Sequence, residues 1–143
     1  MQPIDQSQPN IDERYRTLLI LWAAMFISVL SFLLFINLSG VEPTPNPRLS
    51  LALNTFGLVT VVLSFLVKIK ILQKSAEVQR LDLVQVAHVV AFALCEMSAI
   101  AGLVDHYLTG SLYYIMGFAW ALMGILLHFP QKRHLLNASP QEF

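Results

Sequence analysis

The chain has 143 residues, of which 56% are hydrophobic and only 13% are charged. A soluble domain carries about 25% charged residues, so this composition indicates an integral membrane protein whose partner is the lipid bilayer. The formal net charge is zero, so the chain lacks the basic excess that is typical of nucleic-acid binding. We therefore expect no nucleic-acid partner, and the length leaves no room for a second globular domain.

Four apolar segments follow one another along the chain, and each is long enough for a membrane-spanning helix. The first covers residues 17–38, roughly 33 Å as an α-helix, which is sufficient for a bilayer core. The other three cover residues 49–70, 83–108 and 112–129, and Pro130 ends the last of them. These segments predict an all-α integral membrane protein with four transmembrane helices arranged as two hairpins.

The remaining parts of the chain are polar and are expected to lie outside the bilayer. Residues 1–16, which include Gln, Pro, Asn and Ser, are predicted to form a disordered cytoplasmic N-terminus. Residues 130–143 are predicted to form a cytoplasmic tail. The membrane domain is then the four-helix bundle of residues 17–129.

Lys and Arg residues are distributed very unevenly between the two sides of this arrangement. All of them except Arg48 fall on the side that carries both chain ends: Arg14, Arg16, Lys68, Lys70, Lys74, Arg80, Lys132 and Arg133. Because cytoplasmic loops carry an excess of these residues, we predict that both termini are cytoplasmic. The predicted location is the inner (plasma) membrane of a cell, where the chain is a multi-pass protein.

Glu96 lies half-way along the third apolar segment, at a depth where a carboxyl group is costly. Such residues usually face protein or water and usually have a task, so Glu96 is the candidate proton- or cation-binding residue. A structural alternative is that Glu96 hydrogen-bonds a neighbour such as Asn54, Ser28 or Ser31 and only fixes helix packing. Contact with a substrate or a quinone is a third alternative.

Three other polar residues of the third segment are candidates for a proton relay that includes Glu96. His88 lies nearer the cytoplasmic end of this segment, and Asp105 and His106 lie near its outer end. The steps along the helix are about 12 to 15 Å, so water would have to bridge them. The alternative is that these residues lie at the membrane interface and hydrogen-bond lipid headgroups.

Small residues recur at helical spacing on the third and fourth segments. They are Ala87, Ala91, Cys95, Ser98 and Gly102 on the third segment, and Gly117, Ala121 and Gly124 on the fourth. Small residues let membrane helices approach closely, so we predict that these stripes are helix-packing seams. Through such seams the protein is expected to associate with itself or with other membrane subunits.

The sequence offers no catalytic motif. Cys95 is the single cysteine and cannot form an intrachain disulfide, and we find no CxxC motif, nucleophile elbow or Gly-rich phosphate loop. The histidines do not form a convincing set, because His128 and His134 should lie on the opposite side from His106. We therefore expect no enzyme activity, no cofactor and no metal.

The residues around Glu96 resemble a known membrane helix. The stretch reads Ala93-Leu94-Cys95-Glu96-Met97-Ser98-Ala99-Ile100-Ala101-Gly102-Leu103-Val104. It resembles the carboxylate-bearing helix of the rotor proteolipid, the c subunit, of rotary ATP synthases, which typically reads Ala-x-x-Glu-x-x-Ala-Ile-x-Gly-Leu-Val. The resemblance covers about a dozen residues of the third segment, and it implies that Glu96 is the ion-carrying carboxylate.

Two functions follow as expectations. The first is a small structural or accessory subunit of a membrane complex, with Glu96 as a buried hydrogen-bonding group. The alternative is a proton- or cation-binding membrane protein similar to a rotor proteolipid, with Glu96 as the titrating group.

Overall fold

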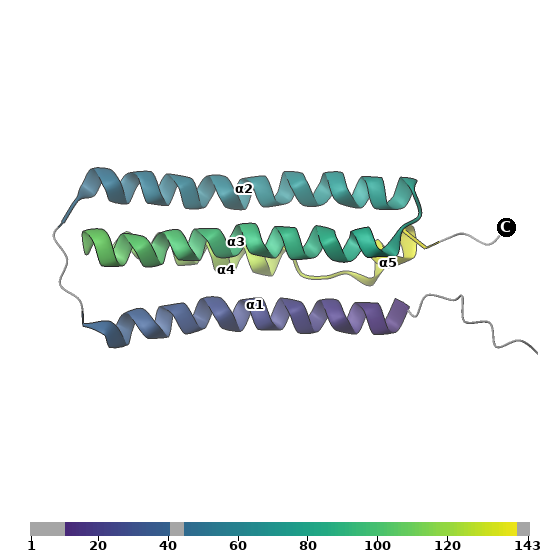
Figure 1. Ribbon diagram of the computed structural model, residues 1–143, viewed down its shortest axis with the longest axis horizontal. Coiled ribbons are helices and arrows are strands. Elements are labelled where there is room, and N and C mark those ends of the chain that lie inside the picture. The colour runs from purple at the N-terminus through teal and green to yellow at the C-terminus, as the bar shows by residue number, and fades with distance from the viewer. Residues whose placement is uncertain (1–10, 41–44, 140–143) are drawn as a thin grey trace, which may run out of the picture.

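The protein is built from helices throughout the part that a computed structural model describes, which is residues 11–40 and 45–139 (Figure 1). The helices are α1 (Ile11–Ser39), α2 (Pro47–Glu77), α3 (Leu81–Thr109), α4 (Tyr114–Leu127) and α5 (Lys132–Asn137). In Figure 1, α3 lies between α1 and α2, and α4 lies behind α3. α1 and α3 run in the same direction, and α2 runs in the opposite direction.

α1, α2 and α3 are long and apolar enough to cross a membrane, with 29, 31 and 29 residues. A helix of this length is about 43 Å long, which exceeds the hydrocarbon core of a bilayer. The fourth span, predicted over residues 112–129, is helical only in α4, which has 14 residues and is about 21 Å long. Three helices that can span a bilayer therefore indicate a membrane protein.

Both ends of the helical region differ from the sequence prediction. α1 begins at Ile11, so residues 11–16 are helical and not disordered, and Asp12 in the first turn suits the helix dipole. The predicted tail contains α5, whose Leu135 is buried against Leu18 of α1 with Ile11 packed nearby. A few apolar side chains in polar segments explain both corrections. Residues 1–10 and 140–143 lie outside the described part of the chain.

The connections between helices follow local capping rules. The Asn46 side chain accepts a hydrogen bond from the backbone N–H of Leu49, and Pro47 occupies the first turn of α2, where its missing N–H costs nothing. Gly110 ends α3 with φ 58°, a left-handed conformation that glycine adopts without strain. The chain then turns back tightly into α4.

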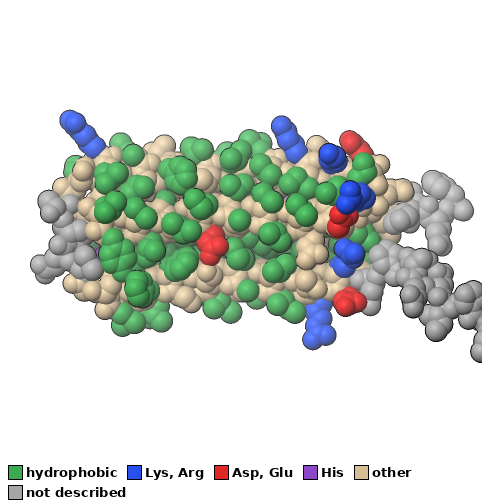
Figure 2. Space-filling view, in the orientation of Figure 1, with side chains coloured by type: hydrophobic (Ala, Val, Ile, Leu, Met, Phe, Trp, Pro, Cys, Tyr) green, Lys and Arg blue, Asp and Glu red, His purple; other side chains and the backbone are tan. Residues whose placement is uncertain are grey.

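α3 is the central helix of the bundle, and α1 is the most peripheral of the long ones. Only Leu18, Val29 and Ile36 of α1 are buried. Its outward face carries large exposed apolar side chains, including Ile20, Ile27, Leu30, Leu34, Phe35 and Leu38. Hydrophobic side chains cover much of the surface in Figure 2, and Lys and Arg gather toward one end of it. This distribution suits a protein surrounded by lipid.

The small residues of α3 and α4 pack against one another and against α2 inside the chain. A Cβ at Gly117 would lie 2.9 Å from the Cα of Gly102, and a Cβ at Gly124 would lie 2.6 Å from the Sγ of Cys95. A Cβ at Gly57 of α2 would lie 2.7 Å from the Oγ of Ser98. These seams are occupied within one chain, so an association with other subunits has to use the outer surfaces.

Candidate functional site

Glu96 lies near the middle of α3 on the side that faces α1. Its Oε1 accepts a hydrogen bond of 2.7 Å from the Oγ of Ser28, a residue near the middle of α1. The Glu96 side chain is only partly buried. Of the three partners considered from the sequence, Ser31 instead donates to the carbonyl of Ile27. Asn54 belongs to α2 and donates to Asp105.

The Ser28–Glu96 hydrogen bond is one of several polar links that hold α1 on the bundle. Nearer the start of α1, the Nε1 of Trp22 donates to the carbonyl of Ile125 at 2.9 Å, which ties α1 to α4. An exposed ion pair joins Asp12 to Lys132 at the start of α5. These polar contacts add to the apolar packing of α1, in which Val29 and Ile36 are buried in the core.

The three relay candidates lie apart from Glu96. The ring of His88 is fully buried, and its Nδ1 lies 2.8 Å from the carbonyl of Val84. The His106 ring packs against Tyr114 at a centroid distance of 4.8 Å. Within the described residues, Glu96 is hydrogen-bonded to Ser28 and to none of these three side chains. The relay remains a prediction that needs bridging water.

Asp105 is the centre of a polar cluster between α2 and α3. Its side chain is fully buried, and its Oδ2 accepts hydrogen bonds from Ser50 Oγ at 2.8 Å and from Asn54 Nδ2 at 3.0 Å. Thr109 Oγ1 donates to the other oxygen at 2.7 Å. Sequence reasoning named Asp105 but missed this cluster. The available signal was two polar pairs at i, i+4 spacing, Ser50/Asn54 and Asp105/Thr109, near the same end of neighbouring helices.

A second cluster, also missed, lies where α2 meets the end of α4. Lys68 is buried with a relative exposure of 7%, and its Nζ donates to the backbone carbonyl of His128 at 3.3 Å. The Nε2 of His128 lies 2.7 Å from Ser64 Oγ, which is 3.6 Å from the Sγ of Cys95. The last carbonyls of a helix need partners, and a cation is favourable there. Lys68 therefore caps the C-terminal end of α4 inside the bundle.

α5 covers this end of the molecule and brings His134 close to His88. The two rings lie 5.6 Å apart between centroids. Burial, with added repulsion from Lys68 and Arg133, lowers the pKa of His134 below its ordinary value. His134 is therefore more readily protonated when α5 leaves the bundle than when it is packed.

Comparisons with known protein families, with curated proteins and with solved structures found no match. The resemblance to a rotor proteolipid accordingly remains a prediction from the residues around Glu96. Within the described residues, no group of three or more His, Cys, Asp or Glu side chains could hold a metal ion.

Proposed function

We propose that the protein is a small structural or accessory subunit of a membrane complex, in which Glu96 holds α1 against α3. The observation that carries this proposal is the 2.7 Å hydrogen bond between Ser28 Oγ and Glu96 Oε1, near the middle of both helices. At bilayer depth, water does not compete for these groups. One such bond fixes the rotation of α1 on α3, and interhelical hydrogen bonds are a common means of membrane helix association.

The outer surface of the bundle supports an accessory role. Large apolar side chains of α1 and α2 point outward, and Leu38 and Leu51 are 77% and 70% exposed. Such surfaces fit either lipid tails or the helices of other subunits. Because the small-residue seams are occupied inside the chain, these outer faces are the surfaces left for association.

The proposal includes a fourth crossing by α4 and cytoplasmic termini in the inner (plasma) membrane. The start of α1 and helix α5 lie at the same end of the bundle in Figure 1, as an even number of crossings requires. The placement of Lys and Arg on that side supports the orientation. Reporter fusions at residue 143 and in the loop after α1 test it, and a cytoplasmic signal from the loop would reverse it.

Purification of the tagged chain from its native membrane in mild detergent tests the accessory role. We expect at least one other integral membrane protein to co-purify in a fixed ratio. The proposal fails if the chain is recovered only by itself, with no co-purifying membrane protein, after mild solubilisation and chemical cross-linking.

Proton or cation binding is the second candidate function. The observation that favours it is the partial exposure of Glu96 at mid-length of α3, with Ser28 hydrogen-bonded to Oε1. A hydrophobic carbodiimide reacts with a protonated carboxyl group in a membrane. Labelling of Glu96 that is slowed by Na⁺ or by raised pH would support ion binding. No labelling at any pH would count against it.

A further inference from the structure

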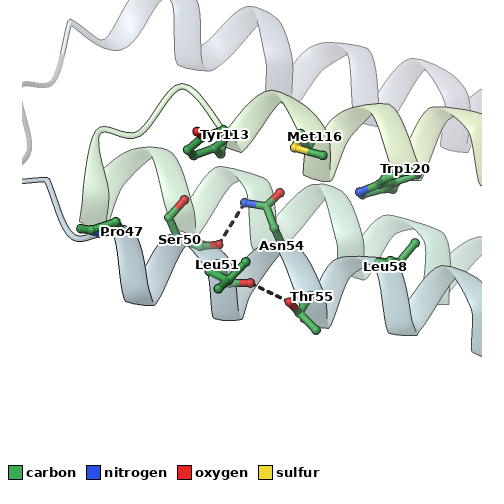
Figure 3. A pocket seen from close by; sticks show the side chains of 9 residues that line it. All are labelled: Pro47, Ser50, Leu51, Asn54, Thr55, Leu58, Tyr113, Met116 and Trp120. Carbon is green, nitrogen blue, oxygen red and sulfur yellow. Dashed lines mark hydrogen bonds between the residues drawn. The ribbon is translucent and has the colours of Figure 1, made fainter.

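A cavity of about 450 Å³ lies between α2 and the first turns of α4, away from Glu96 (Figure 3). Its size falls in the range of small-molecule sites, roughly 300–1,000 Å³. Most of the wall is apolar, with Leu51 and Leu58 from α2 and Met116 from α4. Between Leu51 and Leu58 the cavity follows about two turns of α2, so its shape suits an extended alkyl chain.

Asn54 supplies an unused hydrogen-bond acceptor in this wall. Its Nδ2 donates to the carbonyl of Ser50 and to Asp105 Oδ2, both at 3.0 Å. Because both partners are acceptors, the atom that faces them has to be the amide nitrogen, and the oxygen lies on the other side. Asn54 Oδ1 is buried without a hydrogen-bond partner among the described residues. A buried acceptor of this kind costs free energy until a donor reaches it. Because this oxygen is almost inaccessible in the structure, a donor in the cavity reaches it only when the amide tilts about the soft χ2 angle of asparagine.

A buried carboxylate lies directly behind this wall. Ser50 and Asn54 both line the cavity, and both donate to the same oxygen of Asp105. With Thr109 donating to the other oxygen, both carboxyl oxygens of Asp105 accept hydrogen bonds. The ion pairs of the described residues do not include Asp105, and Arg48 at this end of α2 is exposed. An ammonium group in the cavity would supply the positive partner that this carboxyl group lacks among the described residues.

Two aromatic side chains complete the surroundings on the α4 side. Tyr113 and Trp120 both line the cavity, and Figure 3 shows them on either side of Met116. An ammonium group over an aromatic face is attracted by the ring quadrupole, most strongly by tryptophan. The acceptor of Asn54, the carboxyl group of Asp105 and the two aromatic rings therefore surround one cavity that suits a cationic amphiphile.

We propose that this cavity binds a lipophilic ammonium compound, an alkyl chain with a primary ammonium head. The head donates to Asn54 Oδ1 in front of Asp105, and the chain lies along Leu58 and Met116. A neutral alkyl chain would fill the same apolar wall but bring no positive charge to Asp105. An anionic head would offer no hydrogen-bond donor to Asn54 Oδ1.

Trp120 provides a direct readout, because the chain has only one other tryptophan, Trp22. The Trp22→Phe protein is placed in phosphatidylcholine nanodiscs and titrated with dodecylamine, or with dodecanol as the neutral compound of equal chain length. We expect a saturable change in Trp120 fluorescence with dodecylamine and about ten-fold weaker binding of dodecanol. The Trp120→Phe protein should show no saturable change. Equal binding of the amine and the alcohol would overturn the proposal.

Three variants separate the site from a general membrane effect. Asp105→Asn removes the charge and should weaken dodecylamine binding about ten-fold, with dodecanol unchanged. Leu58→Trp fills the cavity from a partly exposed position and should abolish binding of both compounds. Glu96→Gln removes a different acid of α3 and should change the binding of neither compound. Undiminished dodecylamine binding to folded Leu58→Trp protein would show that the cavity is not the site.

The ammonium head can come from a free lipophilic amine or from the ethanolamine headgroup of a lipid. Replacing part of the phosphatidylcholine by phosphatidylethanolamine distinguishes these sources. A several-fold rise in the dodecylamine concentration at half-saturation would assign the site to the lipid headgroup. An unchanged midpoint would assign it to a free amine. Both results support an ammonium site.

Discussion

Gly117→Ala should destabilise the protein because α3 and α4 touch at this point through their backbones. The added Cβ would lie 2.9 Å from the Cα of Gly102 and 2.9 Å from the carbonyl oxygen of Ser98. Neither atom belongs to a flexible side chain, so the two helices have to separate. The hydrogen bond from Ser98 Oγ to the Gly117 carbonyl, 3.0 Å long, lies in the same contact and would lengthen.

The expected magnitude follows from three effects of different sign. Overpacking in a close-packed contact costs about 1–3 kcal/mol. Weakening one interhelical hydrogen bond in a membrane protein costs about 0.6 kcal/mol. Replacing glycine by alanine within a helix returns up to about 1 kcal/mol. The packing cost exceeds the gain in helix propensity, and the net loss of unfolding free energy should be about 0.6–2.6 kcal/mol.

Reversible unfolding in mixed micelles of a mild detergent and dodecyl sulfate, followed by circular dichroism, measures this loss. Ala119→Leu is the matched control, since Ala119 lies two residues further along α4 and is exposed. Its unfolding free energy should change by less than about 0.5 kcal/mol. Gly117→Ala protein as stable as the unmodified chain would refute the close contact between α3 and α4.

Two further predictions concern the attachments of α1 and α5. A double-mutant cycle with Ser28→Ala and Glu96→Leu, each of which removes one partner of the hydrogen bond, should give a coupling free energy of about 0.6–1.7 kcal/mol in the micelle assay, and no coupling would contradict the hydrogen bond between them. The pKa of His134 is lowered from 6.5 by burial, so the undocked α5 binds protons more readily than the docked one. Docking should be fully stable above about pH 6.5 and weaken as the pH falls below it. Amide exchange protection of α5, corrected for intrinsic exchange, measures this; a pH profile that His134→Gln leaves unchanged would exclude His134 as its cause.

Hydropathy is sufficient to predict the three long helices, because each apolar run exceeds the thickness of a bilayer core. The helix ends are less predictable, since they depend on tertiary contacts. Ile11 and Leu135 lie in polar segments, yet they pack on the same cluster at one end of the bundle. The end of α4 near Pro130 could be predicted, but the buried Lys68 that donates to the carbonyl of His128 there could not.

The polar contacts could also be predicted only in part. The angular position of Glu96, opposite the small-residue stripe, could be predicted from helical periodicity, and Ser28 was among the partners it could reach. The choice of Ser28 depends on the alignment of α1 with α3. The Asp105 cluster requires the register between α2 and α3, which the close approach of Gly57 to Ser98 helps to set. This register cannot be predicted from one sequence, because it depends on how the folded helices pack against each other.

Glu96→Gln in the native membrane tests the central claim most directly, because glutamine retains a hydrogen-bond acceptor for Ser28 but cannot exchange a proton. If Glu96 has a structural role, the Glu96→Gln protein should co-purify with the same membrane subunits and support the same activity of the complex. The Glu96→Leu protein should lose both the association and the activity. A Glu96→Gln protein that folds and assembles normally but leaves the complex inactive would contradict the structural role and favour ion binding.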